Sequence, residues 1–220
     1  MENGILLVDK PAGMTSFGVV ARIRRVLTQK AGRKIKVGHT GTLDPFATGL
    51  MILVVGEACK QAGTYSKLDK VYEATLELGK TSTTGDPEGE ITQKAGEKPP
   101  ASAVEEVLKQ FTGEIEQTPP AFSAIKVNGQ RAYKLARQGQ KVDIPSRRVT
   151  IYRLEIIDYA YPELRIRAHV SSGTYIRSLA EDIGLALGTV AYCQQLRRIM
   201  VGEMSVDQAS SLVELTGSTI

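Results

Sequence analysis

The 220-residue sequence predicts an α+β fold, in which helices and loops flank a mixed, largely antiparallel central sheet. Candidate strands outnumber the helices that could cross between parallel strands, and the two types do not alternate regularly along the chain. Residues 149–157 have the composition of a strand, and residues 164–170 have apolar side chains at every second position. Together the two segments predict a strand pair. The length suits one large domain, or one domain with a small appendage.

The elements of the N-terminal third follow from apolar spacing and turn residues. Residues 4–8 form a short apolar run that leads into a Pro-Ala-Gly turn. A helix should follow, because Thr15 and Ser16 are good N-cap residues and apolar side chains then recur at helical spacing. Residues 37–49 carry three glycines and a proline, which predicts a structured loop, and residues 51–55 read as a buried strand.

The rest of the chain continues with strands and two helices. Residues 71–78 alternate between apolar and polar side chains, so Tyr72 begins the apolar face of a strand. The pair Asn128-Gly129 favours a hairpin turn. The remaining candidates are helices at 102–111 and 175–187, and strands at 149–157, 164–170 and 196–201.

Composition excludes several classes of protein. Hydrophobic residues make up 42% and charged residues 24% of the chain, and no apolar run approaches the about 20 residues of a membrane-spanning helix. The first residues lack the pattern of a secretion signal, so we expect a cytoplasmic protein. Cys59 and Cys193 stand far apart, without a CxxC pair or a nearby histidine, which predicts free thiols and no metal site.

Charge is segregated along the chain, although the net charge is only +4. A first basic zone, residues 10–43, contains no Asp or Glu, and a second, residues 131–153, contains Asp143 as its single acid. Acidic residues gather instead between 86 and 116. Lys and Arg supply sequence-independent affinity for nucleic acid backbones, so the zones predict a phosphate-binding face, with ordinary surface charge as the alternative. The basic residues are Lys10, Arg22, Arg24, Arg25, Lys30, Arg33, Lys34 and Lys36 in the first zone, and Arg131, Lys134, Arg137, Lys141, Arg147, Arg148 and Arg153 in the second.

Two segments could carry chemistry. Asp44 lies on a glycine-rich loop after the first basic zone, where the backbone can approach a ligand closely; equally, Asp44 could only form a turn before Pro45. Arg177 lies at a strand-to-helix junction and could keep a carboxylate ionised, or could be a solvated residue that pairs with Glu181 one turn later. Residues 74–81 fit a relaxed phosphate-loop pattern, but their alternation favours a strand.

The segment Gly38-His39-Thr40-Gly41-Thr42-Leu43-Asp44-Pro45-Phe46-Ala47-Thr48-Gly49 resembles the signature of the TruB-type tRNA pseudouridine synthases, Gly-His-x-Gly-x-Leu-Asp-x-x-Ala-Thr-Gly. Other segments of that family appear in order at 7–16, around Tyr72, at 119–126, at 173–177 and at 196–198. The resemblance covers roughly residues 4–215. Two positions depart from the family pattern, with Phe46 in place of Leu and Met204 in place of Phe.

The resemblance implies a pseudouridine-synthase-like fold and a set of site residues. Asp44 would be the catalytic aspartate, Tyr72 would stack on the target uracil, and Arg177 would hold the Asp44 carboxylate. The implied substrate-binding residues are His39, Tyr175, Leu196 and Lys10. Lys10 would also support the site from behind.

The implied reaction is the isomerisation of uridine to pseudouridine at position 55, in the T-loop of tRNA. The enzyme would extrude the base, break and re-form its bond to the sugar, and require no cofactor and no metal. Asp44 would act as nucleophile or as base, and the sequence leaves this choice open.

The implied organisation is a catalytic domain at 1–205 with a mobile RNA-clamping insertion at 119–148. A short tail at 206–220 would follow, without the PUA-type domain that is common in the family. We expect a monomer that binds the T-arm stem-loop of tRNA and needs neither a protein partner nor a membrane. The alternatives are an RNA-binding or tRNA-folding protein without relevant catalysis, and a guide-RNA-dependent relative.

Overall fold

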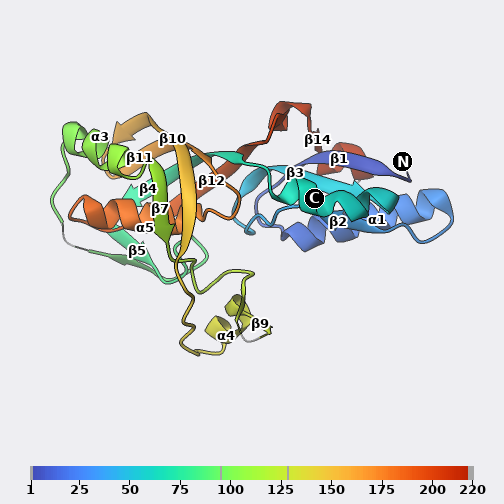
Figure 1. Ribbon diagram of the computed structural model, residues 1–220, viewed down its shortest axis with the longest axis horizontal. Coiled ribbons are helices and arrows are strands. Elements are labelled where there is room, and N and C mark those ends of the chain that lie inside the picture. Colours follow the sequence, from blue (N-terminus) through green and yellow to red (C-terminus); the bar gives the residue numbers. More distant parts are fainter. Residues whose placement is uncertain (1, 95, 128, 218–220) are drawn as a thin grey trace. The chain divides into compact units, whose positions relative to one another are not determined.

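The computed structural model describes residues 2–94, 96–127 and 129–217, and these form two compact units (Figure 1). Unit 1 comprises Met1–Glu73 and Leu196–Ile220, and unit 2 comprises Ala74–Gln195. The chain passes from one unit to the other within two strands, β4 (Lys70–Leu78) and β12 (Ala191–Val201). Each unit is therefore described by itself.

Among the described residues, ten strands form one mixed sheet with the path β14-β1-β3-β12-β4-β11-β10-β7, to which β2 and β13 are added by pairing with β3 and β12. The β1–β3, β2–β3, β7–β10, β10–β11 and β12–β13 pairs are antiparallel, whereas β1–β14 and β3–β12 are parallel. The predicted α+β class with a largely antiparallel sheet is confirmed. The bounds are β1 (Gly4–Lys10), β2 (Val37–His39), β3 (Thr48–Val55), β7 (Gly113–Gln117), β10 (Arg147–Ala160), β11 (Glu163–Val170), β13 (Met204–Ser205) and β14 (Ser210–Ser211).

In unit 1, β1 pairs with β3 along its whole length, and helix α1 (Ser16–Ala31) follows β1 in the sequence. The predicted strand at 4–8 and the predicted helix are confirmed, and the Thr15 side chain caps the helix by accepting a hydrogen bond from Gly18 N. The predicted loop at 37–49 is wrong at both ends. Its first three residues form β2 and its last two begin β3, because the backbone of residues 37–39 pairs with residues 53–55.

The C-terminal segment that the sequence predicts to be a tail has regular structure in unit 1. The 3-10 helix η2 (Val206–Gln208) leads to β14, which adds to β1, and then to α6 (Leu212–Thr216). Ser211 and Glu214 form a reciprocal capping box at the start of α6. Unit 1 also contains η1 (Gly56–Gln61) and α2 (Ala62–Ser66). Residues 218–220 of the predicted tail lie outside the described residues.

In unit 2, β10 and β11 form the predicted strand pair, with α3 (Ala101–Gln110) and α5 (Ile176–Ala186) as its main helices. The two-sided pattern predicted for β4 is only partly right, because Thr75 and Glu77 on the polar side are buried as well. Glu77 is compensated by an ion pair with Lys80 and by hydrogen bonds from Tyr192 Oη (2.5 Å) and Gln194 Nε2 (3.1 Å). This part of the sheet is therefore covered on both faces.

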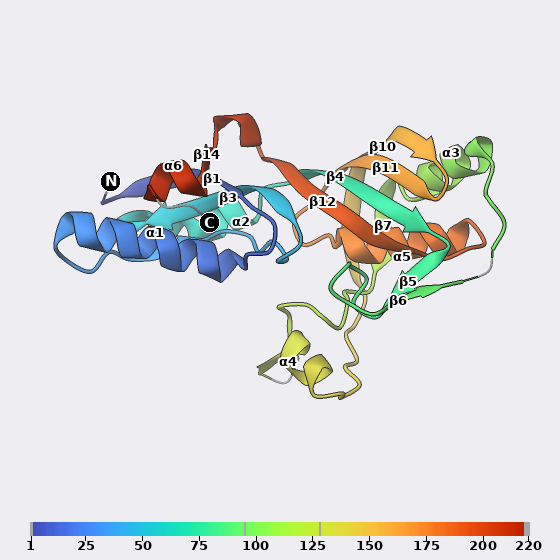
Figure 2. The same cartoon turned by 180° about the vertical axis from the view of Figure 1, so that it is seen from behind.

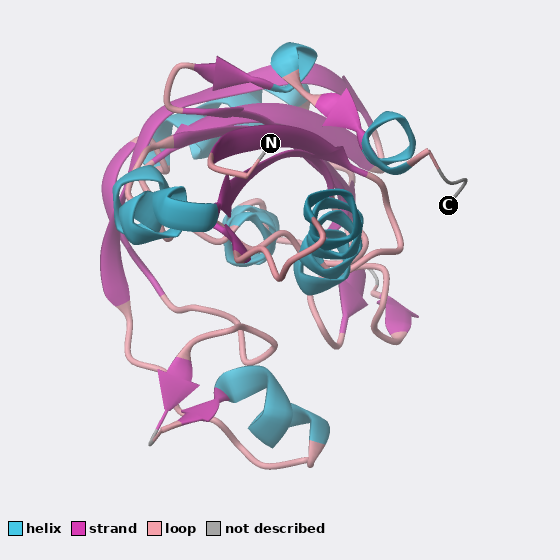
Figure 3. Ribbon diagram, turned by 90° about the vertical axis from the view of Figure 1, so that its right-hand side faces the viewer, coloured by secondary structure: helices cyan, strands magenta, loops and turns pink. Residues whose placement is uncertain are grey.

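The segment between β7 and β10 projects from the rest of unit 2, as Figure 3 shows at its lower edge. It contains the two-stranded hairpin β8 (Lys126–Val127) and β9 (Gln130–Arg131), followed by α4 (Ala132–Arg137). The predicted hairpin is confirmed by this pairing, and Gly129 takes the positive φ of 83° that the turn needs. Asn128 lies outside the described residues. A second small sheet pairs β5 (Lys80–Ser82) with β6 (Ile91–Gln93).

Membrane-spanning helices, metal-binding clusters and disulfides can be assessed for the described residues. Within them, no helix is both long and apolar enough to cross a membrane, and no cluster of three or more His, Cys, Asp or Glu residues is arranged to hold a metal ion. Cys59 is half-buried and Cys193 is buried, and neither forms a disulfide in this part of the chain.

Candidate active site

The Asp44 loop, defined as residues 40–47, connects β2 to β3 in unit 1. At its start, Thr40 N donates to Ile52 O (3.2 Å), and at its end Ala47 N donates to Asp44 O (3.2 Å). Asp44 is half-buried. The two ends of the loop are thus tied to β3 and to the backbone of Asp44 itself.

Lys10 supports the loop through hydrogen bonds from its buried side chain. Its side chain is completely buried, and Nζ donates to Pro11 O (2.8 Å), Met14 O (2.7 Å) and Pro45 O (3.1 Å). Gly13 N also donates to Pro45 O (2.8 Å). The residue after Asp44 is therefore fixed by a charged donor and a backbone donor. This is the supporting position that the family resemblance implies, while substrate binding by Lys10 stays a prediction.

Ser16, the first residue of α1, fixes the other side of Asp44. Its buried hydroxyl donates to Leu43 O and accepts from Leu43 N, both at 2.8 Å. A single serine thus satisfies both backbone groups of the residue before Asp44. The sequence suggested Ser16 only as a possible helix cap, a role that Thr15 fills.

Arg198 on β12 joins the start of the loop to β3, and its role was missed in the sequence. It is 2% exposed, and it donates from Nε to Leu50 O (2.7 Å) and from Nη2 to Gly41 O (3.2 Å). The same residue explains why Gly49 has no side chain. Gly49 has φ +103°, and a Cβ there would lie 2.2 Å from the carbonyl oxygen of Arg198, across the β3–β12 pairing.

Burial and, to a smaller extent, Arg198 lower the pKa values of two basic groups of unit 1, His39 and Lys70. Burial and the nearby Arg198 guanidinium both lower the pKa of His39, so the imidazole is neutral at neutral pH. His39 Nδ1 is buried and has no hydrogen-bond partner within the described residues. Burial and Arg198 likewise lower the pKa of Lys70 to about 8, against a smaller opposing effect of Asp69. Tyr72, which is 8% exposed, lies two residues after Lys70 and on the same face of β4.

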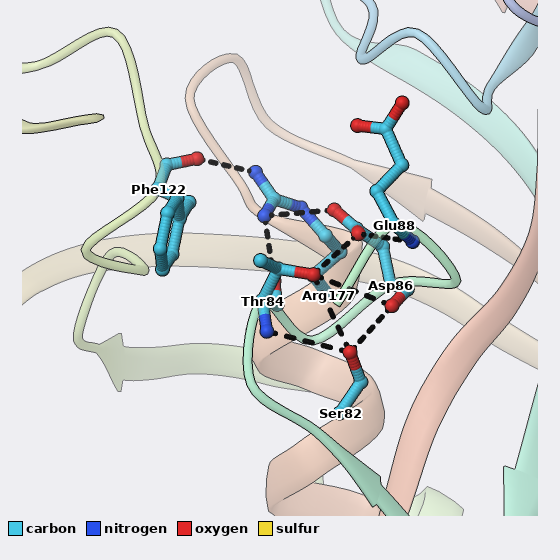
Figure 4. A network of polar contacts seen from close by, with 6 residues as sticks. All are labelled: Ser82, Thr84, Asp86, Glu88, Phe122 and Arg177. Atoms are coloured by element: carbon cyan, nitrogen blue, oxygen red, sulfur yellow. Dashed lines mark hydrogen bonds and ion pairs between the residues drawn. The ribbon is translucent and has the colours of Figure 1, made fainter. Parts of the chain in front are cut away.

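In unit 2, Arg177 is the centre of a buried polar network (Figure 4). It is 3% exposed, and Nη1 lies 3.1 Å from Asp86 Oδ2. The guanidinium also donates to Thr84 O and to Phe122 O, both at 2.8 Å. Its orientation is therefore fixed from three sides, and a solvated residue that pairs with Glu181 is excluded. Asp86 in turn accepts from Thr84 Oγ1 (2.6 Å) and from the backbone of Glu88 (3.0 Å).

Asp86 is a second residue of the candidate site that was missed in the sequence. It lies in a polar, Thr- and Gly-rich stretch in which nothing in the local spacing distinguishes it from surface acids. The sequence indicated that Arg177 could pair with a carboxylate elsewhere in the chain, but nothing in it indicated Asp86.

Tyr175 precedes α5 as its N-cap residue. The buried side chain of Gln117 holds its backbone on both sides, because Tyr175 N donates to Gln117 Oε1 (2.8 Å) and Gln117 Nε2 donates to Tyr175 O (3.0 Å). The guanidinium of Arg147, from the second basic zone, lies 5.1 Å from the centre of the Tyr175 ring.

The predicted site residues are thus divided between the two units. Unit 1 holds His39, Asp44, Lys10, Tyr72 and the buried Leu196, whereas unit 2 holds Tyr175 and Arg177. The predicted hold of Arg177 on Asp44 would join the units and stays a prediction. An apolar cavity of about 240 Å³ lies elsewhere in unit 1, and none of the predicted residues lines it; its lining is Leu6, Ile23, Val26, Leu27, Lys30 and Leu215.

Comparison with known families covers nearly the whole chain. The model of the N-terminal domain of TruB family pseudouridylate synthases matches residues 24–176. The model of the tRNA pseudouridylate synthase B C-terminal domain matches residues 177–220.

Individual relatives agree with these matches. The tRNA pseudouridine synthase B of Cupriavidus pinatubonensis is 44% identical over 216 residues, which cover 97% of this chain and 67% of that protein. The enzyme of the same name from Thermobifida fusca is 45% identical over 98% of this chain and 75% of that protein. The tRNA pseudouridine synthase B of Dechloromonas aromatica is 46% identical over 97% of this chain and 70% of that protein.

Solved structures give the same fold. A chain of a Cbf5-Nop10-Gar1 complex superimposes with a TM-score of 0.74 at 30% identity, over 98% of this chain and 54% of its own length. A chain of an H/ACA RNP bound to a substrate RNA containing 2'-deoxyuridine superimposes with a TM-score of 0.73 at 28% identity, over 98% of this chain and 53% of its own length. The present chain thus spans about half the length of these two chains. With two family models that together cover residues 24–220, and relatives at 44–46% identity along almost its full length, the chain belongs to the TruB family of pseudouridylate synthases.

Proposed function

We propose that this chain converts the uridine at position 55, in the T-loop of tRNA, into pseudouridine, with Asp44 as the catalytic carboxylate. The observation that carries the proposal is the fixing of the Asp44 loop. Both neighbours of Asp44 in the sequence are held, Leu43 by Ser16 and Pro45 by Lys10, so the backbone that carries the carboxylate is positioned in advance. Preorganisation of this kind is typical of catalytic groups.

The reaction needs few groups. The bond between N1 of uracil and C1′ of the ribose breaks, the base turns, C5 bonds to C1′, and the proton on C5 is replaced by one on N1. Substrate and product have the same atoms, so the reaction is an isomerisation that requires neither an oxidant nor nucleotide hydrolysis. Asp44 would attack the sugar, add to the base or remove a sugar proton.

The proposal assigns Arg177 to hold the Asp44 carboxylate. An arginine stays charged at all relevant pH values, and its planar fork suits a carboxylate. The ion pair with Asp86 and the bond to Phe122 O support this role, because they fix the plane of the guanidinium before any substrate arrives.

The target base must leave its stack, at a cost of about a few kcal/mol. Tyr72 would offset this cost by stacking on the uracil. His39 would contact the extruded nucleotide, and its neutral ring and unpartnered Nδ1 support a hydrogen bond to a ligand at that place. Leu196 and Tyr175 would complete the pocket.

The insertion at 119–148 would clamp the RNA. Its exposed basic residues Arg131, Lys134 and Arg137 support phosphate contacts. Its root is anchored to α5, because Arg177 donates to Phe122 O and Ser178 Oγ donates to Thr118 O (2.9 Å). Motion would therefore be confined to the projecting hairpin and α4. Limited proteolysis checks this: bound tRNA should slow cleavage within 124–146, and unchanged cleavage would contradict the clamp.

Guide-RNA-dependent modification is the second candidate, because of the likeness to a chain of the Cbf5-Nop10-Gar1 complex at 30% identity. The relatives named tRNA pseudouridine synthase B, at 44–46% identity, favour an enzyme that acts on tRNA. Action without a protein partner, as a monomer and in the cytoplasm, is part of the proposal. A purified chain that modifies bare tRNA would exclude dependence on a guide. A tRNA-folding role would be additional, and an Asp44→Ala variant would separate folding from modification.

The substrate position can be tested directly. The purified chain is incubated with an unmodified tRNA transcript and with the same transcript carrying cytidine at position 55, and pseudouridine is mapped by chemical modification and primer extension. We expect one modified site in the first RNA and none in the second. Equal modification at other uridines, or conversion that depends on an added guide RNA, would refute the assignment.

A further inference from the structure

The outer face of α1 carries an exposed aromatic ring beside an arginine. Phe17 is 65% exposed, and the guanidinium carbon of Arg24 lies 5.9 Å from the centre of its ring. The two residues are seven positions apart, or about two helical turns, and therefore share one face. The opposite face of α1 is the buried one, with Val19, Val20 and Ile23 among its residues. Figure 2 shows α1 along the outside of unit 1.

Nothing in unit 1 requires an apolar residue at this position. The packing of α1 uses its other face, so Phe17 adds little to the core. A single exposed apolar residue needs no explanation by itself. Phe17 differs because its ring is paired with a cation and because every Lys, Arg, Asp or Glu position in the sequence segment 10–43 is basic.

The charge around Phe17 suits a polyanion. Residues 10–43 contain no Asp or Glu, and Arg25 and Lys30 are exposed on the same helix. A protein partner would require acidic side chains in this position, whereas a nucleic acid supplies both phosphates and flat apolar bases. Proteins bind single-stranded RNA with this combination of an aromatic ring and nearby basic groups.

The position along the chain connects this face to the Asp44 loop. Phe17 directly follows Ser16, whose hydroxyl makes two hydrogen bonds to Leu43, the neighbour of Asp44. A nucleotide on Phe17 would therefore lie close to the nucleotide that is modified.

We propose that Phe17 and Arg24 form a stacking platform for one unpaired nucleotide of the substrate RNA, separate from the uridine that enters the Asp44 site. The base stacks on the free face of Phe17 and Arg24 pairs with an adjacent phosphate. The proposed function supplies only the identity of the RNA here, since binding can be measured without conversion.

The test is the dissociation constant of an unmodified tRNA transcript, measured by filter binding at several KCl concentrations. Phe17→Ala should weaken binding about tenfold at every concentration, because it removes one stacked base and no charge. Phe17→Tyr should restore affinity. Arg24→Gln should reduce the slope of log K against log salt by about 0.7, as expected for one phosphate contact on a single strand.

Two matched controls make the test specific. Leu185 on α5 is also 65% exposed, and Lys109 on α3 is an exposed cation in the acidic part of the chain. Leu185→Ala and Lys109→Gln should leave affinity within about twofold of wild type. Because the Phe17 face contributes to binding and not to the chemical step, Phe17→Ala should also raise KM and leave kcat unchanged.

The inference is overturned if Phe17→Ala binds as wild type does, or if Leu185→Ala loses as much affinity. It is equally overturned if gel filtration shows that Phe17→Ala breaks a self-association while RNA affinity stays constant, since the face would then bind a second copy. A wild-type chain that binds the transcript through Phe17 but converts no uridine would sink the proposed function and leave this inference intact.

Discussion

Replacing Arg198 with lysine should disconnect the start of the Asp44 loop from β3 while keeping the positive charge. Arg198 reaches Leu50 O and Gly41 O at once because its guanidinium has several donors in a rigid plane. A lysine ammonium at the end of a flexible stem can replace one of these bonds but not both. The other carbonyl is left in a buried place without its donor.

The size of the effect follows from the bonds. A hydrogen bond from a charged donor contributes about 1.5–3 kcal/mol, so the loss of one should lower the free energy of unfolding by about that amount. The catalytic cost is separate from the stability cost. A shift of about 1 Å in the Asp44 loop is expected to lower kcat by about 10- to 100-fold, with little change in KM, because RNA binding is unaffected.

The assays are urea denaturation and single-turnover pseudouridine formation, with Arg197→Lys as the matched control. Arg197, one residue earlier, pairs mainly with the carboxylate of Asp9 (2.8 Å) and is 40% exposed at its side chain. Its replacement should cost no more than about 1 kcal/mol and leave kcat within about twofold. An Arg198→Lys enzyme with wild-type kcat would refute the positioning role.

The effect of Arg198 on the pKa of His39 can be measured separately. Arg198→Met should raise the pKa of His39, because one of the two causes that lower it is removed, whereas Arg198→Lys should leave it low. The chain has only two histidines, so an NMR titration resolves His39 once His169 is replaced. An equal pKa in the three proteins would contradict the assigned cause.

Three further predictions concern stability, and chemical denaturation measures all of them. Gly49→Ala should cost about 3 kcal/mol or more, because its Cβ would meet a backbone oxygen at 2.2 Å in a left-handed conformation, whereas Gly38→Ala, whose Cβ would meet only a methyl group at 3.6 Å, should cost less than about 1 kcal/mol. The pKa of Lys70 in the folded state is about 8, below its usual 10.5, so the folded protein loses this proton at a lower pH than the unfolded chain does. The free energy of unfolding of wild type, relative to that of Lys70→Gln, should therefore rise by roughly 2 kcal/mol between pH 8 and 10.5. A difference that does not change with pH would show that burial does not disfavour the charged amine. Asp86→Asn should cost about 3–5 kcal/mol, because it removes the buried carboxylate that lies 3.1 Å from Arg177 Nη1, and a loss under 1 kcal/mol would show that this ion pair contributes little.

The sequence predicts well those features that depend on local pattern. Alternation and helical spacing located β1, α1, β10, β11 and α5, with most errors at their ends. The Asp44 loop was recognisable because glycine and proline restrict its structure and because its motif resembles a known family. Its flanks were misjudged, since the pairing of β2 depends on a partner strand about fifteen residues away.

The residues that position the site were harder to predict, because their partners are distant in the sequence. Arg198 meets Gly41 across 157 positions, and Arg177 meets Thr84 across 93. No local periodicity records such contacts. The burial of Glu77 was missed for the same reason, since Tyr192 and Gln194 satisfy it from another strand.

The measurement that tests the central claim most directly compares the wild-type chain with Asp44→Asn on an unmodified tRNA transcript, without added metal or cofactor. Both proteins should bind the RNA with similar affinity, because the change keeps the size of the side chain and does not touch the bonds that fix the loop. Wild type should form pseudouridine to about one equivalent at position 55, and the variant should form none. Conversion by Asp44→Asn at a rate near that of wild type would contradict the account, because the reaction would then not depend on the Asp44 carboxylate.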